Sequence, residues 1–265
     1  MANNPYASIE HGEPGTIGWR IHYFEEVTST QHVAAEMAEA GAAQGTVVIA
    51  ELQTAGRGRL GRTWHSPSGL NLYTTIILRP TRPLAEVPRL SLMAGIASAE
   101  TLATVAPGLA TLKWPNDIWL NGRKAGGIIS EAIADAKQQL SCVLIGIGLN
   151  LNLGPDDIPA DLRDKATSVR IATGHRCDRI AVAATLFNRL NSRYMEIEGH
   201  GFAALRAEYE RYFALTGKMV TVVDGTSRIS GRVSGIDADG AMMLETASGT
   251  IHVMAGEVSV EGAYA

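Results

Sequence analysis

The dipeptide Asn121-Gly122 constrains the fold of this chain more than any other local feature, because it separates two strand-like runs. The first run covers residues 118–120, and the second starts at Arg123. Both central positions of a two-residue hairpin turn need positive φ, which Asn and Gly tolerate. We therefore predict an antiparallel hairpin that brings Asp117 and Lys124 to one site.

Elsewhere the chain alternates between strand-like and helical patterns. Ser29 or Thr30 is typical of a helix N-cap, and this helix is expected to run through Ala40, with Gly41 ending it. Further strands are expected at residues 21–25, 46–50, 71–78 and 141–149, and helical spacing returns over 180–194 and 202–213. Gly217 is the expected end of the last helix.

The most apolar stretch covers residues 90–112, but Glu100, Pro107 and Gly108 interrupt it. A membrane span needs a longer uninterrupted apolar run, so we interpret the stretch as a buried amphipathic helix. After residue 216 the pattern changes to short β runs at 219–223, 229–236, 241–244 and 251–253, which suit a small β-barrel. We expect a loose N-terminal arm over residues 1–18, a large domain over 19–215 and a small domain over 216–265.

The composition is that of an ordinary globular protein, with 265 residues, 46% of them hydrophobic, and a formal net charge of −4. This balance argues against nucleic-acid binding, which normally requires a basic excess. The two cysteines, Cys142 and Cys177, form neither a disulfide framework nor a metal-type spacing. No secretory signal is evident at the N-terminus, so we expect a cytoplasmic protein.

The densest chemical signal is the arginine–glycine loop, residues 56–62, which contains three arginines and three glycines. Glycines let backbone N–H groups turn toward an anion, and guanidinium groups bind carboxylate or phosphate oxygens in pairs. This composition favours phosphate binding, although a solvated surface loop explains it equally well. No Gly-Lys-Ser/Thr follows the loop, so it is not a Walker A motif, nor is it a dinucleotide-binding fingerprint.

Charged residues also flank the predicted hairpin, in the runs 113–117 and 123–127. Two lysines, Lys113 and Lys124, together with the carboxylate of Asp117, fit nucleotide chemistry, while solvated lysines on a charged hairpin are the simpler interpretation. A further run, residues 146–150, ends a strand with Asn150, whose amide could bind an adenine edge or simply form a turn.

Taken in order, these motifs resemble those of biotin–protein ligases. The motifs are Ser29-Thr30, Gln53 with the arginine–glycine loop, Trp64, Lys113-Trp-Pro-Asn-Asp117, Arg123-Lys-x-x-Gly127 and Gly146-x-Gly-x-Asn150. The resemblance covers residues 24–152 closely. It implies an α+β fold with a mixed, mainly antiparallel sheet and helices, of the class II synthetase-like type, followed by a C-terminal SH3-like β-barrel.

The resemblance also implies a role for each residue. Lys124, Arg59 and Lys113 would be catalytic, with Lys124 the chief cation. Residues expected at biotin are Ser29, Thr30, Gln31, Gln53, Arg57, Arg59, Trp64, Lys124, Gly126 and Gly127. Residues expected at the nucleotide are Gly56, Arg57, Gly58, Arg59, Arg62, Trp64, Lys113, Asn116 and Asn150. Asp117 would help to hold Mg²⁺.

Three positions depart from the family pattern. Gln31 stands where Asn usually follows Ser-Thr, Gly126 replaces the commoner Ala, and Leu60 replaces an Arg that some members carry. Too few residues precede the first strand for a helix-turn-helix module, so we expect no DNA binding.

The implied activity is formation of biotinyl-5'-AMP from biotin and MgATP, followed by transfer of biotin to a lysine of a biotin carboxyl carrier protein. A lipoate or octanoate ligase or transferase is the nearest alternative, and a non-catalytic nucleic-acid-binding module and an inactive biotin-binding protein are more distant ones. The identity of the carrier, the presence of a homodimer and the role of the barrel stay open.

Overall fold

A computed structural model describes residues 4–9, 17–134 and 139–260. The larger of its two sheets has seven strands in the order β1-β2-β3-β7-β6-β5-β4. Their bounds are β1 Arg20–Val27, β2 Thr46–Gln53, β3 Leu72–Leu78, β4 Ala110–Lys113, β5 Asp117–Leu120, β6 Arg123–Ala134 and β7 Leu140–Leu149. Strands β1 and β2 pair in parallel and the other neighbours pair antiparallel, so the expected mixed, mainly antiparallel sheet is confirmed.

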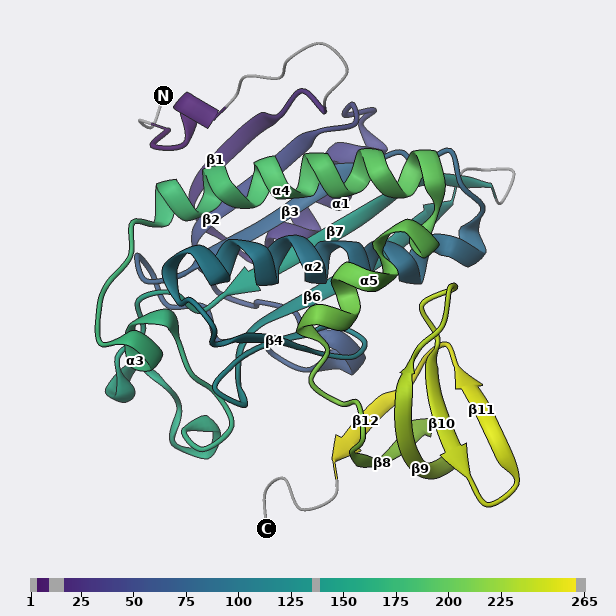
Figure 1. Cartoon of the computed structure of the whole chain (residues 1–265). Helices are drawn as coiled ribbons and strands as arrows, with labels where there is room; N and C mark the ends of the chain where they lie inside the picture. Colours follow the sequence, from purple (N-terminus) through teal and green to yellow (C-terminus); the bar gives the residue numbers. More distant parts are fainter. Residues whose placement is uncertain (1–3, 10–16, 135–138, 261–265) are drawn as a thin grey trace.

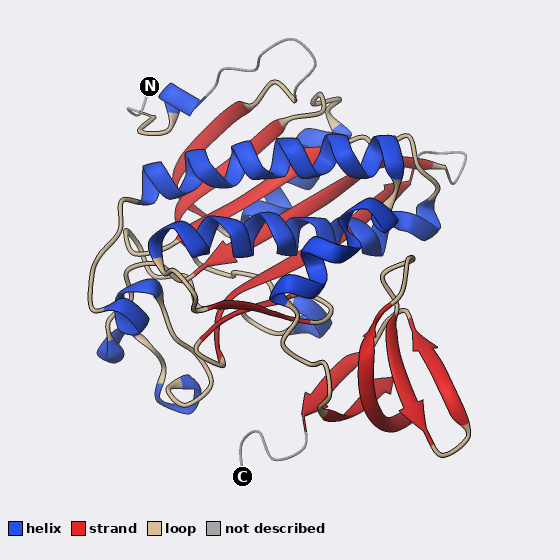
Figure 2. Cartoon of the chain, in the orientation of Figure 1, coloured by secondary structure: helices blue, strands red, loops and turns tan. Residues whose placement is uncertain are grey.

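Helices cover both faces of this sheet (Figures 1 and 2). The helices are α1 Thr30–Glu39, α2 Val87–Val105, α3 Val169–Thr173, α4 Arg179–His200 and α5 Phe202–Tyr212. Helix α2 packs on one face, with α4 and α5 beside it, and α1 packs on the other face against β2, β3 and β7. Short 3₁₀ turns lie at Ala7–Ile9, Arg59–Gly61, Leu84–Glu86, Pro155–Asp157 and Ala160–Leu162.

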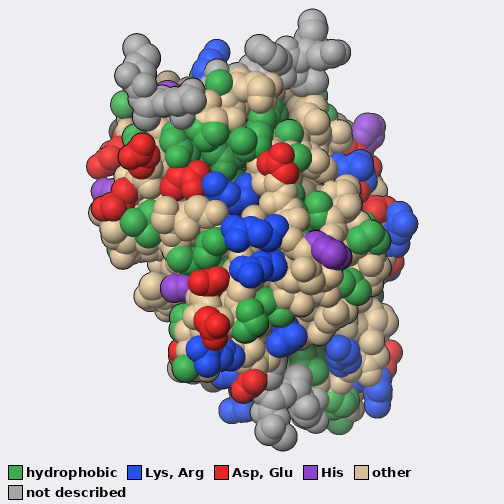
Figure 3. Space-filling model, turned by 90° about the vertical axis from the view of Figure 1, so that its left-hand side faces the viewer, with side chains coloured by type: hydrophobic (Ala, Val, Ile, Leu, Met, Phe, Trp, Pro, Cys, Tyr) green, Lys and Arg blue, Asp and Glu red, His purple; other side chains and the backbone are tan. Residues whose placement is uncertain are grey.

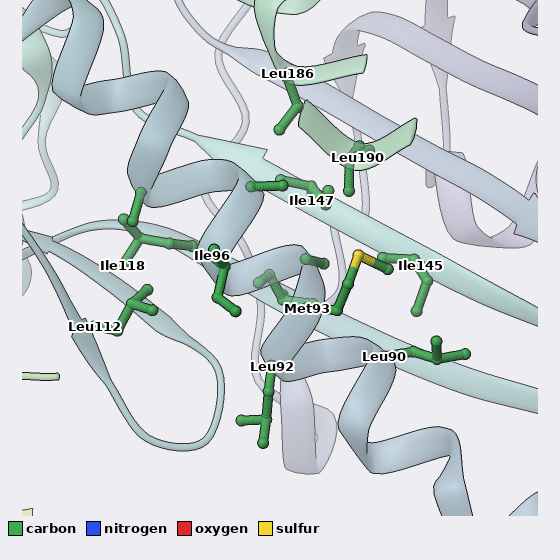
Figure 4. Close-up of a cluster of buried hydrophobic side chains, with 14 of the residues drawn as sticks. Leu90, Leu92, Met93, Ile96, Leu112, Ile118, Ile145, Ile147, Leu186 and Leu190 are labelled. Carbon is green, nitrogen blue, oxygen red and sulfur yellow. The ribbon is translucent and has the colours of Figure 1, made fainter. Parts of the chain in front are cut away.

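The main core lies between the sheet and α2, where the side chains of α2, β7 and α4 interdigitate (Figure 4). Met93 and Ile96 of α2 face Ile145 and Ile147 of β7, and Leu190 of α4 closes the cluster. Burying each such side chain contributes about 1.5–3 kcal/mol. This packing fixes the sheet, and with it the strand ends that carry the candidate site.

The predicted hairpin is confirmed. Asn121 and Gly122 have φ values of 49° and 76° and join β5 to β6. Asp117 consequently lies opposite Gly127 in the strand register. The predicted helix cap is confirmed too, because the Ser29 side chain accepts a hydrogen bond from the Gln31 N–H.

The prediction of one amphipathic helix over residues 90–112 is wrong in two respects. The helix ends at Val105, because Pro107 cannot donate a backbone hydrogen bond and Gly108 adopts a φ of 76°. The remainder becomes β4, which pairs with β5. The expected burial is confirmed, but residues 90–102 are buried on every side because the sheet and α4 enclose them, so the helix has no exposed polar face there and is not amphipathic. Within the described residues, no helix is both long and apolar enough to cross a membrane.

The C-terminal part forms a second, antiparallel sheet in the order β11-β10-β9-β8-β12. Its strands are β8 Met219–Asp224, β9 Ser227–Ile236, β10 Met242–Thr246, β11 Gly249–Val253 and β12 Glu257–Val260. Among the strand pairings of the described residues, none joins β11 to β12, so the sheet is shown but closure of an SH3-like barrel is not. Sequence patterns missed β12. Gly217 does not end α5, which stops at Tyr212, but lies in the connection to β8.

This second sheet contacts the larger domain through the turn between β9 and β10. Arg89 of α2 binds the side chain and carbonyl of Asp239, and the Trp114 indole N–H donates to the Gly240 carbonyl at 3.1 Å. The expected loose N-terminal arm is partly docked, because Tyr6 is only 1% exposed and packs against Tyr23. The domain boundaries at residues 18 and 215 stay predictions.

Candidate functional site

A small pocket of about 470 Å³ lies at the N-terminal end of α1, on the α1 face of the large sheet. Eleven of the residues predicted to bind biotin or nucleotide line it. They are Ser29, Thr30, Gln31, Gln53, Arg57, Gly58, Arg59, Trp64, Asn116, Lys124 and Gly127. Helix α1, the arginine–glycine loop and the strands β3, β6 and β7 therefore meet at one site.

The inner wall of this pocket is a chain of polar side chains. Gln53 Oε1 accepts hydrogen bonds from the Thr30 backbone N–H at 2.9 Å and from the Thr30 hydroxyl at 3.1 Å. The Thr75 hydroxyl lies 2.9 Å from Thr30 Oγ1 and 3.2 Å from Gln31 Oε1. Buried and unpartnered among the described residues are Gln31 Nε2 and Thr74 Oγ1. A buried polar atom without a partner is costly, so this wall can bind a compact polar ligand group.

Trp64 and two glycines form the opposite wall. A Cβ atom on Gly148 would lie 2.6 Å from Trp64 Nε1, and one on Gly127 would lie 3.3 Å from the same ring. The Lys124 ammonium lies 5.5 Å from the centre of the Trp64 ring. A side chain at position 148 would therefore displace the indole, and one at position 127 would contact it tightly.

A second, larger pocket of about 1420 Å³ adjoins the first. The two share five lining residues, namely Gly58, Arg59, Trp64, Asn116 and Lys124. Predicted residues that line only the larger pocket are Arg62, Lys113, Asp117 and Asn150. A small polar compartment thus opens onto a wider one that contains cationic groups.

Lys124 and Asp117 form an ion pair at the junction of the pockets, with Nζ 2.5 Å from Oδ1. Lys113 lies opposite Asp117 in the β4–β5 register, and its ammonium is 5.4 Å from the Trp119 ring centre. Burial lowers the pKa of Lys113 below its usual range, and Lys124 lowers it further against the opposing effect of Asp117. Burial and the neighbouring Lys124 both disfavour the charged form of Lys113. An anion bound beside these two lysines would stabilise that charge, so this part of the pocket suits an anionic ligand.

Each arginine of the arginine–glycine loop is held by a protein acceptor. Arg57 pairs with Glu131 of β6 at 2.8 Å, and Arg62 pairs with Glu257 of β12. Arg59 donates to Asn116 Oδ1 at 2.6 Å and to the Gly256 carbonyl at 3.5 Å. The loop thus lies between the large sheet and the start of β12, with its guanidinium groups at the edges of both pockets.

Asp117 is the one predicted metal ligand, and the described residues contain no cluster of three or more His, Cys, Asp or Glu side chains suited to a metal. Mg²⁺ usually takes one or two protein carboxylates and completes its shell with phosphate oxygens and water. A single carboxylate on the wall of the larger pocket fits that donor set.

Two predicted residues line neither pocket. A Cβ atom on Gly126 would lie 2.8 Å from a Leu149 methyl, so this glycine permits sheet packing rather than ligand access. Gly56 accepts the Trp64 backbone N–H at 2.8 Å and supports the loop from behind.

Sequence reasoning also missed several lining residues. In the small pocket they are Tyr73, Thr74, Thr75, Ile128 and Ile129. In the larger pocket they are Leu60, Thr63, His65, Trp114, Pro115 and Trp119, together with residues of the segments 153–166 and 256–258. Leu60, Trp114 and Pro115 lie inside the motifs already described, whereas the segments 153–166 and 256–258 carry no motif that could have indicated them.

Figure 3 shows the face at the left-hand side of Figure 1, where Lys and Arg side chains form a central group bordered by acidic and hydrophobic ones. On this face, positive charge is concentrated locally in a chain whose net charge is −4.

Comparison with known proteins identifies the class of this site. The model of the biotin/lipoate A/B protein ligase family matches residues 23–150, and that of the biotin protein ligase C-terminal domain matches residues 215–260. The bifunctional ligase/repressor BirA of Bacillus subtilis is 36% identical over 244 residues, 92% of this chain and 75% of the relative.

Two further comparisons point to the biotin ligases within this biotin/lipoate ligase family. A biotin–[acetyl-CoA-carboxylase] ligase of Paracoccus denitrificans is 34% identical over 223 residues, 81% of this chain and 90% of the relative. The structure of the biotin protein ligase of Aquifex aeolicus in complex with biotin and ATP matches with a TM-score of 0.79 and 29% identity, over 91% of this chain and 98% of that chain. The chain belongs to the biotin–protein ligase family, as its motif order had indicated, and it is a ligase.

Proposed function

We propose that this ligase forms biotinyl-5'-AMP from biotin and ATP and then transfers biotin to a lysine of a biotin carboxyl carrier protein. One observation carries the proposal. A compact polar pocket opens directly onto a wider cationic pocket, and Arg59, Trp64 and Lys124 belong to both. Two different substrates can therefore meet at these shared residues. The biotin and ATP named for the Aquifex aeolicus complex support this assignment.

In the first half-reaction, a carboxylate oxygen of biotin attacks the α-phosphorus of ATP, and the bond to the β-phosphate breaks to release pyrophosphate. Two anions must approach each other, and at about 4 Å two unit charges repel by roughly 4 kcal/mol at an effective dielectric of 20. Lys124 and Arg59, which line both pockets, would oppose this repulsion, and Lys113 would support the phosphates.

The small pocket would hold the ureido ring of biotin against Ser29, Thr30 and Gln53, with Gln31 at its inner wall. Trp64 would pack beside the biotin chain, and Gly127 would leave room for that chain. Arg57 and Gly58, at the mouth of the pocket, would contact the carboxylate end. Holding both reactants in this way can lower the barrier by about 7–11 kcal/mol in favourable cases.

The larger pocket would hold the nucleotide, with Asn116 and Asn150 toward the base and Arg62 and Lys113 toward the phosphates. Asp117 would help to hold Mg²⁺, which neutralises phosphate charge when it is bound. If the ion pair between Asp117 and Lys124 opens when the nucleotide binds, the carboxylate becomes free for Mg²⁺ and the ammonium for the phosphates.

In the second half-reaction, the amine of a carrier lysine attacks the carbonyl carbon of biotinyl-AMP, loses a proton, and releases AMP. This route needs no covalent enzyme intermediate. We further propose a cytoplasmic location, which the two unpaired cysteines support, and a closed SH3-like barrel as the C-terminal domain. We propose no nucleic-acid partner, and a homodimer is compatible with all of these assignments.

The decisive test is the intact mass of a biotin carboxyl carrier domain after incubation with this protein, MgATP, and equal concentrations of biotin, lipoate and octanoate. We expect a biotin-sized increment on one lysine, absent when ATP is left out. A lipoyl or octanoyl increment would refute the substrate assignment, and an unchanged mass would refute the transfer step.

A further inference from the structure

Asn71 lies directly before β3 and is only 1% exposed. It lines neither pocket, yet its side chain contacts residues of both. Its Oδ1 accepts the Leu151 backbone N–H at 2.9 Å. Its Nδ2 donates to the Tyr73 hydroxyl at 3.0 Å and faces Asn150 Oδ1 at 3.5 Å. Tyr73 belongs to the small pocket and Asn150 to the larger one.

Backbone groups fix the orientation of both amides. The Leu151 N–H can only donate, so the atom of Asn71 that it meets must be oxygen. The Thr167 carbonyl can only accept, so the atom of Asn150 that lies 3.0 Å from it must be nitrogen. The nitrogen of Asn71 then faces the oxygen of Asn150. Rotating the Asn150 amide by half a turn would place two acceptors together at Thr167 and two donors together at Asn71.

A fixed amide presents a fixed pattern to its ligand. Asn150 keeps one unused N–H on Nδ2 and one unused lone pair on Oδ1, and it lines the larger pocket. Adenine offers an amino donor beside a ring-nitrogen acceptor, which matches an amide of this orientation. Hypoxanthine carries a carbonyl oxygen in place of that amino group. In the same pose this oxygen would face Asn150 Oδ1, and two acceptors cannot form a hydrogen bond.

We propose that Asn71 is a positioning residue for the base specificity of the larger pocket: together with the Thr167 carbonyl, it holds the Asn150 amide in the orientation that accepts adenine and rejects 6-oxopurines. The inference rests on the proposed nucleotide role of that pocket. Asn71 acts through Asn150 and touches no substrate.

The test compares ATP with inosine triphosphate in Asn71→Asp and Asn71→Ala, using kcat/KM for biotin-dependent pyrophosphate release and calorimetric Kd values for each nucleotide. In Asn71→Asp, the introduced carboxylate would attract the Asn150 nitrogen and favour the rotated amide, whereas alanine removes only the contact with Asn71 and leaves the Thr167 carbonyl in place. We expect the wild-type preference for ATP to shrink at least about tenfold in Asn71→Asp, equal to about 1.4 kcal/mol. Asn71→Ala should shift in the same direction but by less, because the Thr167 carbonyl still binds the Asn150 nitrogen.

Asn152→Ala is the matched control. Asn152 is a buried amide that bonds the Cys177 backbone through both its oxygen and its nitrogen, and it lines neither pocket. Its loss should lower the melting temperature and leave the nucleotide preference unchanged. A wild-type protein without preference, unchanged preference in both Asn71 variants, or an equal shift in Asn152→Ala would overturn the inference. Absence of pyrophosphate release from wild type would instead contradict the proposed function, and the Kd ratios would still decide the role of Asn71.

Discussion

The ammonium of Lys124 lies 2.5 Å from the carboxylate of Asp117, at the point where the small polar pocket meets the larger one. The hairpin turn at Asn121 and Gly122 creates this relationship, because it folds β6 back along β5. Lys124 lines both pockets, so its ammonium is within reach of both proposed substrates. The energetic contribution of the ion pair to folding is small because the pair is partly exposed, so we assign its importance to catalysis.

Lys124→Ala should reduce biotinyl-AMP formation by at least about two orders of magnitude, since it removes a cation that faces transition-state charge. Pyrophosphate release under single-turnover conditions measures this loss. Lys218→Ala, at an exposed position before β8, is the control and should behave as wild type. Near-normal release by Lys124→Ala would refute the catalytic role.

Arg59→Ala should keep the fold but release biotinyl-AMP into solution. The side chain bridges the arginine–glycine loop to Asn116 and to the Gly256 carbonyl, so its loss opens the wall shared by the pockets. Rapid filtration with labelled biotin measures the retained intermediate. Arg211→Ala, exposed on α5, should retain it fully. Equal retention by both variants would contradict the role of Arg59.

Gly148→Ala should weaken biotin binding by about 1–3 kcal/mol, because the added methyl would displace the Trp64 ring from its place against β7. Calorimetry with biotin gives the Kd. Gly199→Ala in α4 meets no atom within 4 Å of the new Cβ and should instead stabilise the protein by about 0.5–1 kcal/mol. An unchanged biotin Kd in Gly148→Ala would show that Trp64 does not border the ligand.

Lys113→Met should stabilise the protein more at neutral than at alkaline pH. Burial lowers the pKa of Lys113 in the folded state. The protonated side chain is therefore less stable in the folded protein than in the unfolded chain, which costs folding free energy. The resulting cost is fully present below the lowered pKa and disappears as the pH rises toward the usual lysine range. Urea unfolding of both proteins at neutral and alkaline pH measures the difference. A stability difference that stays constant or grows with pH would contradict this sign.

Local signals in the sequence were sufficient for much of the fold. The Ser29 cap and the Asn121-Gly122 turn need only neighbouring residues, and both were predicted correctly. The boundary between α2 and β4 was missed because apolar residues continue through it, and the stop at Pro107 and Gly108 was judged a mere interruption. Strand β12 is too short to give a clear period.

Only those site residues that belong to a continuous sequence motif could be predicted. The contact of Arg62 with Glu257 joins residues 195 positions apart, and no local pattern relates them. Asn71 precedes a strand in the way that many turn residues do, and its link to Asn150 exists only after β3 and β7 have paired. Tertiary packing, rather than residue type, decides which side chains outside the motifs reach the pockets.

The common wall of the two pockets also limits how this enzyme can change. A substitution at Arg59, Trp64 or Lys124 alters the surroundings of both ligands at once, so neither affinity can be tuned there independently. Residues confined to one compartment, such as Thr75 on one side and Ile158 on the other, are free of that coupling. Engineering for an unnatural acid or an altered nucleotide would therefore start from residues that line only one pocket and would leave the shared residues unchanged.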